Sequence, residues 1–201
     1  MTMMPYADLT PSPQLPDAAL VAASLAGDER AFTALYRRHG AVVYRFAYHW
    51  SGTAAIADEV AQETFIHLHR RGGDFDADRG ELRSWLLGIA RNLVRRQLSA
   101  RHNETPTAST DEGPLLAAPF GNQADSGTDP LQVLLGSEAS RELHRLIRRL
   151  PCNFRDALVL VDLEEYSYAD AAAICGCEIG TIRSRLSRAR ALLTDALTVK
   201  R

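Results

Sequence analysis

The sequence predicts an all-α fold of two small helical domains joined by a flexible acidic linker. Apolar residues recur at helical spacing along residues 17–101 and again from about residue 130 onward, and no run alternates as a strand would. Residues 103–130 are rich in Thr, Ser, Pro, Gly, Asn and Asp and lack periodicity, which is typical of a linker. The 46% hydrophobic content and the net charge of −2 exclude a chain that is disordered overall.

Four helices are expected in a first domain over residues 17–102, after a proline-rich, disordered tail over residues 1–16. Glycine and cap residues mark the breaks between the helices. The expected helices cover residues 18–26 with Asp17 as N-cap, 28–50, 54–71 and 81–101, and they are separated by Gly27-Asp28, by Ser51-Gly52-Thr53 as a break with a cap, by Gly72-Gly73, and by a turn-rich loop over 74–80.

A second domain over residues 131–201 is expected to contain three or four short helical segments. Pro130 and Pro151 suit the first position of a helix, where a proline costs least. A helix-turn-helix is expected at its end, with a first helix over 167–175, a turn at Gly176-Cys177, and a recognition helix from about Ile179. Ser167 is predicted to cap the first of these helices, with Asp170 at the third position as in a capping box.

The predicted recognition helix has two contrasting faces. Ile182, Leu186, Ala189 and Leu193 recur at i, i+4, i+7 and i+11, the spacing of a buried apolar stripe. Arginines and serines occupy the other face. A basic face with short side chains on a stable helix is what the DNA major groove admits, so this helix is predicted to read duplex DNA.

Charge is strongly segregated along the chain. Residues 82–101 carry five arginines and no acidic residue, residues 103–140 carry six acidic residues and no basic one, and residues 141–201 carry 11 basic and eight acidic residues. Two basic segments separated by an acidic one suggest two contacts with nucleic acid. Ordinary solvated helix faces are the alternative, which composition alone does not exclude.

Two sets of motifs, in the right order, resemble bacterial sigma factors of the extracytoplasmic-function (ECF) group of the sigma-70 family. The C-terminal set, similar to region 4, comprises Leu150-Pro151, Leu163-Glu164, Ser167-Tyr168 and Gly180–Arg190. The N-terminal set, similar to region 2, comprises Ala31-Phe32, Leu35-Tyr36, Ala57-Asp58-Glu59-Val60, Gln62-Glu63, Phe65, Phe75-Asp76, Arg79-Gly80, Trp85-Leu86 and Ile89-Ala90-Arg91-Asn92. The chain departs from the family pattern at Glu165, where Gly is usual, at Ala171, where Ile is usual, at His69 and at Ser187.

The resemblance implies a transcription initiation factor that directs core RNA polymerase to promoters, in a stress or envelope response. Contacts with minus-thirty-five bases are expected from Arg183, Ser184, Ser187 and Arg188, and contacts with phosphates there mostly from Thr181, Arg185 and Arg190. At the minus-ten element, Asn92 is expected to capture a flipped base, beside Arg91, Arg95, Arg96 and Ser99. The polymerase-binding face is expected to comprise Asp58, Glu59, Gln62, Glu63 and Ile66.

The implied partners are core RNA polymerase, through its β′ clamp helices and β flap, promoter DNA, and an anti-sigma factor. The protein is expected to be cytoplasmic, without membrane insertion, cofactor or metal. Cys152, Cys175 and Cys177 are interpreted as ordinary small residues, since C-x-C lacks the usual zinc spacing. Two alternatives remain at this point: a stand-alone helix-turn-helix regulator, which would not need the region 2 motifs, and an enzyme, against which the absence of clustered catalytic residues argues.

Overall fold

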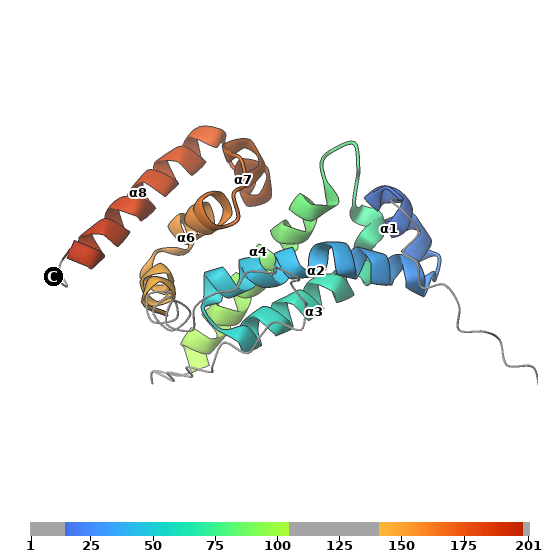
Figure 1. Cartoon of the computed structure of the whole chain (residues 1–201), viewed down its shortest axis with the longest axis horizontal. Coiled ribbons are helices and arrows are strands. Elements are labelled where there is room, and N and C mark those ends of the chain that lie inside the picture. The colour runs from blue at the N-terminus through green and yellow to red at the C-terminus, as the bar shows by residue number, and fades with distance from the viewer. Residues whose placement is uncertain (1–14, 105–140, 199–201) are drawn as a thin grey trace, which may run out of the picture.

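The computed structural model describes residues 15–104 and 141–198, and every regular element within these ranges is helical (Figure 1). The all-α prediction is therefore confirmed. The N-terminal domain consists of α1 (Asp17–Leu25), α2 (Glu29–Ser51), α3 (Ala54–Arg71), the 3-10 turn η1 (Gly72–Asp74) and α4 (Leu82–Glu104). Residues 1–14 of the predicted tail and 105–130 of the predicted linker lie outside the described residues.

The described part of the C-terminal domain contains four continuous helical segments, which agrees with the three or four that were expected. Residues 141–149 are helical, and they are followed by α6 (Cys152–Leu158), the π-helical turn η2 (Val159–Leu163), α7 (Tyr168–Cys175) and α8 (Ile179–Thr198). The π-helical turn continues α6 directly, and nothing in the spacing of the sequence predicted it. The predicted helix-turn-helix is confirmed as α7 and α8, with Gly176 between them at φ 64°.

In both domains, the helix faces on which apolar residues recur are buried. In the N-terminal domain, α2 packs against α1, α3 and α4, and Leu35 and Phe46 on α2 are fully buried. In the C-terminal domain, Ile182, Leu186 and Ala189 of α8 are buried against α6 and α7, as their spacing predicted. Burial of such a side chain stabilises the fold by about 1.5–3 kcal/mol, so these stripes determine which helix faces remain for partners.

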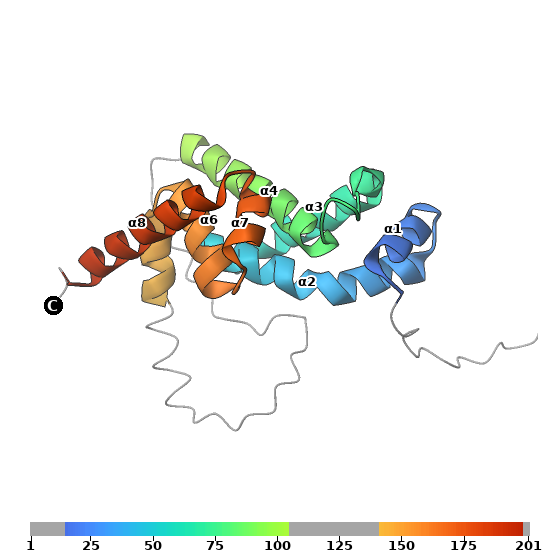
Figure 2. The same ribbon diagram turned by 90° about the horizontal axis from the view of Figure 1, so that it is seen from above.

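The two domains also pack against each other, which the sequence did not predict. α7 contacts α4 and η2 contacts α2, so one continuous set of buried apolar residues runs through both domains. Figure 2 shows α6 and α7 lying over α2 and α4, with α8 extending away from them.

Two predicted helix starts are confirmed in atomic detail. Asp28 is the N-cap of α2 and accepts hydrogen bonds from the amides of Arg30 and Ala31. Ser167 accepts a hydrogen bond from the Asp170 amide at 3.1 Å, and its hydroxyl donates to the Asp170 carboxylate at 2.6 Å. A cap of this kind typically contributes about 1 kcal/mol, which secures the start of α7.

At two other predicted breaks, no side chain makes a capping hydrogen bond. Asp17 is the first residue of α1 rather than its N-cap, because its carboxylate is engaged by Arg38 and His39 on α2. Thr53 occupies the N-cap position of α3, but its side chain makes no capping hydrogen bond. Its amide instead bonds to the Ser51 hydroxyl at 3.2 Å. Both sequence signals located the start of the helix correctly, although neither Asp17 nor Thr53 caps it with its side chain.

Glu165, the departure from the family glycine, has a left-handed backbone. Its φ of 57° is the only positive φ of a non-glycine residue in the described part of the chain. The left-handed turn lets the Tyr166 amide donate to the Leu160 carbonyl at 2.9 Å, which reverses the chain after η2. This conformation costs an L-residue about 1–2 kcal/mol, whereas glycine adopts it freely.

We therefore expect Glu165→Gly to stabilise the protein by about 0.5–1 kcal/mol, after the larger entropy that glycine loses on folding is subtracted. Urea-induced unfolding of the full chain would measure this. Glu165→Ala is the matched control, because it removes the same charge but keeps the Cβ. Equal stabilisation by the alanine variant would show that charge rather than backbone strain is responsible.

Candidate nucleic-acid interface

The exposed face of α8 carries most of the residues predicted to meet the minus-thirty-five element. Arg183, Ser184, Ser187, Arg188 and Arg190 are exposed, and Thr181 and Arg185 are half-buried. This division follows from the buried stripe on the opposite side of the helix. A continuous polar face nearly three turns long is therefore available to a groove of DNA.

Three of these arginines are already oriented by neighbours within the C-terminal domain. The Arg183 guanidinium lies 5.6 Å from the centre of the Tyr168 ring. Arg190 donates to both carboxylate oxygens of Asp162, at 3.0 and 2.6 Å. Arg185 points toward the sulfur of Cys177 at 3.6 Å. Arg188, on the same face, is also exposed.

The predicted minus-ten residues on α4 divide into two groups. Asn92, Arg96 and Ser99 are exposed; Arg96 contacts Glu63 of α3 at 3.1 Å, and the Ser99 hydroxyl donates to the carbonyl of Arg95. Arg91 and Arg95 instead face the C-terminal domain. Docking of that domain therefore covers part of the face predicted to bind DNA.

A buried carboxylate from the C-terminal domain holds the second group. Asp156 on α6 is fully buried, and its Oδ2 accepts a hydrogen bond from Arg91 Nε at 2.6 Å and lies 3.5 Å from Arg95. Its Oδ1 accepts from Trp50 Nε1 at 2.8 Å. Arg155 packs over the Trp50 ring, 4.2 Å from its centre. These five residues, hereafter the Asp156 cluster, join α2, α4 and α6.

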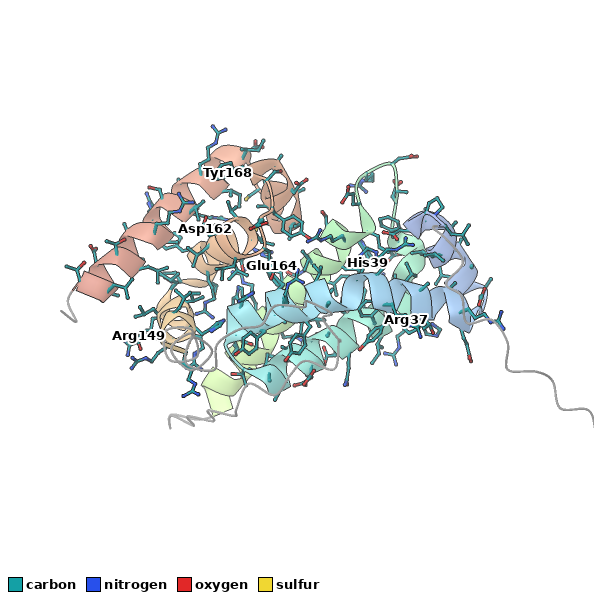
Figure 3. All side chains as sticks on the ribbon, in the orientation of Figure 1. Arg37, His39, Arg149, Asp162, Glu164 and Tyr168 are labelled. Carbon is teal, nitrogen blue, oxygen red and sulfur yellow. The ribbon has the colours of Figure 1, made fainter. Side chains whose placement is uncertain are left out.

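Four further side chains form a second polar contact between the domains. Glu164, whose side chain is 1% exposed, accepts a hydrogen bond from Arg45 of α2 at 3.1 Å (Figure 3). His49 of α2 lies 3.6 Å from the same carboxylate and 3.3 Å from His144. Burial raises the pKa of Glu164, while burial, followed by the neighbouring His144 and Arg45, lowers the pKa of His49 to about 4.

The residues predicted to meet the polymerase share one face of α3. Asp58, Glu59, Gln62 and Ile66 are exposed and Glu63 is half-buried, whereas Val60, Ala61, Thr64, Phe65 and Leu68 on the other side are buried. Ile66, at the C-terminal end of this acidic face, keeps 48% of its surface exposed. The helix thus presents a mixed acidic and apolar surface directed away from the core.

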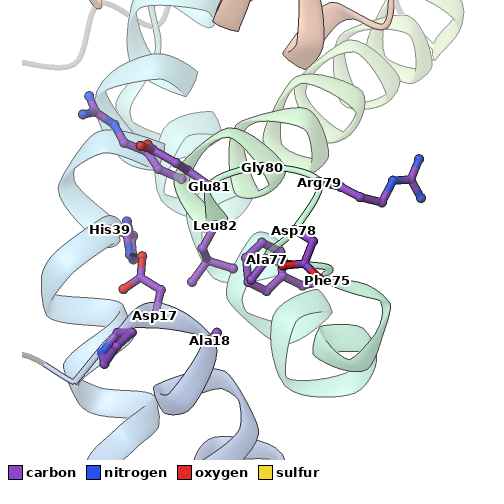
Figure 4. A pocket seen from close by; sticks show the side chains of 12 residues that line it. Asp17, Ala18, His39, Phe75, Ala77, Asp78, Arg79, Gly80, Glu81 and Leu82 are labelled. Atoms are coloured by element: carbon purple, nitrogen blue, oxygen red, sulfur yellow. Dashed lines mark hydrogen bonds and ion pairs between the residues drawn. The ribbon is translucent and has the colours of Figure 1, made fainter.

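An open hollow of about 710 Å³ lies beside the loop that precedes α4. Figure 4 shows Asp17 and His39 next to each other on one wall, with Phe75 and Asp78 across from them. Burial lowers the pKa of His39, although the Asp17 carboxylate, 2.8 Å away, acts in the opposite direction. Asn92, which is expected to capture a flipped base, is not among the residues that line this hollow.

Sequence reasoning missed the residues that join the domains. Trp50, Asp156 and Glu164 belong to apolar or helical segments, and no motif marks them as partners of residues some 100 positions away. Arg91 and Arg95 were identified, but only as DNA contacts. A pairing between distant segments leaves no local signal, because it depends on how the helices pack.

Comparisons with known proteins agree with this architecture. Residues 35–104 match the model of Sigma-70 region 2, and residues 140–193 match that of Sigma-70, region 4. The ECF RNA polymerase sigma factor SigM of Mycobacterium tuberculosis is 36% identical over 90% of this chain and 84% of its own length. The RNA polymerase sigma-H factor of Pseudomonas aeruginosa is 32% identical over 90% of this chain and 93% of its own length.

Solved structures show the same fold. The sigma factor RpoE of Bartonella quintana, determined in complex with the anti-sigma factor NepR, superposes with a TM-score of 0.60 at 28% identity, covering 85% of this chain and 98% of that one. CnrH, determined with the cytosolic domain of CnrY, superposes with a TM-score of 0.65 at 24% identity, covering 92% of this chain and 99% of that one.

The class defined by the two domains is that of the sigma-70 initiation factors, with regions 2 and 4 on one chain. Within that class, the chain belongs to the extracytoplasmic-function sigma factors. It is accordingly a transcription initiation factor that binds core RNA polymerase and directs it to promoters. Within the described residues, none of the helices has the length and apolarity that crossing a membrane requires.

The contact around His49 leads us to expect that acid weakens the packing of the two domains. Because the pKa of His49 in the packed form is about 4, below its ordinary 6.5, its contribution is fully present above about pH 6.5 and is lost as pH falls toward 4. The loss is at most about 1.4 kcal/mol per pH unit. Glu164 acts in the opposite sense, since its raised pKa favours the packed form at lower pH.

Urea unfolding of the wild type and of His49→Gln, at about pH 7 and about pH 5, would test this expectation. The glutamine keeps a polar group at the contact but does not titrate. The wild type should lose stability between the two pH values, and the variant should lose less or gain. Equal losses in both proteins would contradict the assignment to His49.

Proposed function

We propose that the three exposed polar faces have separate binding roles in transcription initiation. The α8 face binds the minus-thirty-five element, the α4 face binds and opens the minus-ten element, and the α3 face binds core polymerase. The observation that supports this division best is that one chain carries two separate basic helix faces, on two domains, in addition to an acidic face. A duplex-only regulator would need only the first.

The α8 face is proposed to read duplex DNA through its exposed side chains. Arg183, Ser184, Ser187 and Arg188 contact base edges, while Thr181, Arg185 and Arg190 contact phosphates. The pairing of Arg190 with Asp162 leaves its outer edge for a phosphate oxygen. An arginine that pairs with guanine discriminates by about 1–3 kcal/mol, which makes this face the source of sequence preference.

The α4 face is proposed to hold the strand that leaves the duplex. Asn92 is exposed and carries both a donor and an acceptor, as capture of a base edge requires. Arg96 and Ser99 on the same face, together with Arg91 and Arg95 when they are released, supply contacts with the backbone. The loop before α4 and the hollow beside it lie at the start of this helix.

The α3 face is proposed to dock on the β′ clamp helices of the polymerase. Asp58, Glu59 and Glu63 suit a basic partner, and carboxylates of this kind contribute orientation and association rate more than affinity. The exposed Ile66 supplies the apolar contact that a purely solvated acidic face would lack. The C-terminal domain is proposed to contact the β flap.

The protein is proposed to act in the cytoplasm without catalysing a reaction and without a cofactor. An anti-sigma factor is proposed as a further partner, as the sigma factor of Bartonella quintana was determined in complex with one. Such a partner would restrain the α3 face until a signal, such as envelope stress, releases it.

Run-off transcription with core polymerase tests the proposed function. The template is a library with a randomised upstream segment, and sequencing of the transcripts identifies the promoters used. Promoter-dependent transcripts should require the full chain. If the folded protein binds duplex DNA but yields no such transcript, the stand-alone regulator is the correct reading.

In the same assay, Asn92→Ala should lower transcription from duplex templates by about tenfold, the cost of losing hydrogen bonds to a base. On a template whose minus-ten segment is already unpaired by mismatches, most of the lost transcription should return. A loss of the same size on both templates would show that Asn92 acts elsewhere than in strand opening.

For α8, Arg188→Ala should weaken binding to duplexes selected by the wild type by about tenfold to 100-fold and relax the preference at one base position. Fluorescence anisotropy with the selected and scrambled duplexes measures both effects. Arg149→Ala, which removes an exposed arginine of the same domain outside α8, is the control. An equal effect of the two variants would indicate that only overall charge matters.

A further inference from the structure

The groups that interact in the Asp156 cluster come from both domains. The carboxylate belongs to the C-terminal domain, and all three groups that donate to it or pair with it belong to the N-terminal domain. Trp50 Nε1 donates a hydrogen bond to Oδ1 of Asp156. Arg91 Nε donates to Oδ2, and the Arg95 guanidinium lies near the same oxygen. The N-terminal domain thus contributes a ready-made site for an oxyanion, assembled from α2 and α4.

A carboxylate and a phosphodiester offer the same chemistry to such a site. Both present two outward oxygens with negative charge, and guanidinium groups bind both with charge-assisted hydrogen bonds. Arg91 and Arg95 lie on α4, the helix proposed above to hold the minus-ten strand. Asp156 therefore takes the position on these arginines that a backbone phosphate of the strand would need.

We propose that Trp50 Nε1, Arg91 and Arg95 form a phosphate-binding site for the minus-ten strand, and that Asp156 occupies this site when the two domains are packed together. Docking of the C-terminal domain and binding of the strand at this site are then mutually exclusive. The proposal rests on the proposed function of α4, and it adds that Asp156 of the same chain competes with the DNA for this site.

The energetics of the cluster favour an exchange of partners rather than a simple opening. Removing one partner from a buried ion pair leaves an uncompensated charge, which is strongly unfavourable. If a phosphate replaces Asp156, the two arginines stay paired while the aspartate becomes hydrated. Contacts around the cluster hold the packed form in the absence of DNA: Arg155 stacks on Trp50, and Asn153 accepts a hydrogen bond from Arg95 at 3.0 Å.

The test compares the full-length wild type with Asp156→Asn, which keeps the shape of the side chain and removes its charge. The probe is a fluorescently labelled oligothymidylate, because a phosphate contact does not depend on base sequence. Asp156→Asn should bind it about tenfold more tightly, with a salt dependence steeper by about one phosphate. Small-angle scattering should show a larger radius of gyration. Asp195→Asn, an exposed change of equal charge, should show none of these effects.

A double-mutant cycle identifies the site itself. Arg91→Ala should have little effect on oligothymidylate binding in the wild type, where Asp156 occupies the site. In the Asp156→Asn background, Arg91→Ala should remove most of the gained affinity. If the Asp156→Asn chain opens without binding more tightly, or if Arg91→Ala is neutral in both backgrounds, the proposed phosphate site is wrong.

Circular dichroism checks that Asp156→Asn is folded. Should it fail to fold, Trp50→Phe replaces it in the cycle, because the phenyl ring keeps much of the packing and lacks the N–H that serves Asp156. It should open the chain and bind oligothymidylate more tightly than the wild type, and Arg91→Ala in this background should remove most of that gain; an unopened chain, or no effect of Arg91→Ala, overturns the proposal. Wild-type transcription together with unchanged oligothymidylate binding in the variants would refute the phosphate site and leave the proposed function intact.

Discussion

The arrangement of the two domains depends on one buried charge, the carboxylate of Asp156. An ionised carboxylate loses its hydration when it is fully buried, and this cost is offset only where donors are arranged around it. Here the donors Trp50 and Arg91 come from the other domain. Asp156 is therefore satisfied only when α6 lies against α2 and α4. Apolar contacts stabilise this packing, but they do not dictate its register in the way that the directional hydrogen bonds of a charge do.

This constraint explains why the polar residues of α4 separate into two groups. Asn92 and Arg96 remain exposed because they lie on the side of the helix away from the C-terminal domain, whereas Arg91 and Arg95 are drawn toward Asp156. The face of α8 escapes a similar division, because its arginines are oriented by Tyr168 and Asp162 of their own domain. The packed molecule thus keeps its duplex-reading face open and partly covers its strand-binding face.

Local signals predicted most of the fold because helices depend mainly on neighbouring residues. The apolar stripe of α8, the break at Gly27-Asp28 and the capping box at Ser167 could all be identified from residues within about one or two turns. The same logic failed at Asp17 and Thr53. At Asp17, the distant residues Arg38 and His39 compete for the carboxylate, and Thr53 occupies the N-cap position without a side-chain capping bond. The predicted site residues were likewise found on exposed faces, while their partners were not foreseen.

By itself, the sequence determined that the protein is all-α, where its helices begin and end, which faces they bury, and which family it belongs to. These properties follow from periodicity, caps and motifs, all of which act over short distances along the chain. Only the tertiary structure decided that Trp50, Arg91 and Asp156 meet and that Glu164 is buried against Arg45. The physical reason is that each depends on how helices pack in space, and packing brings together residues whose separation along the chain carries no periodic signal.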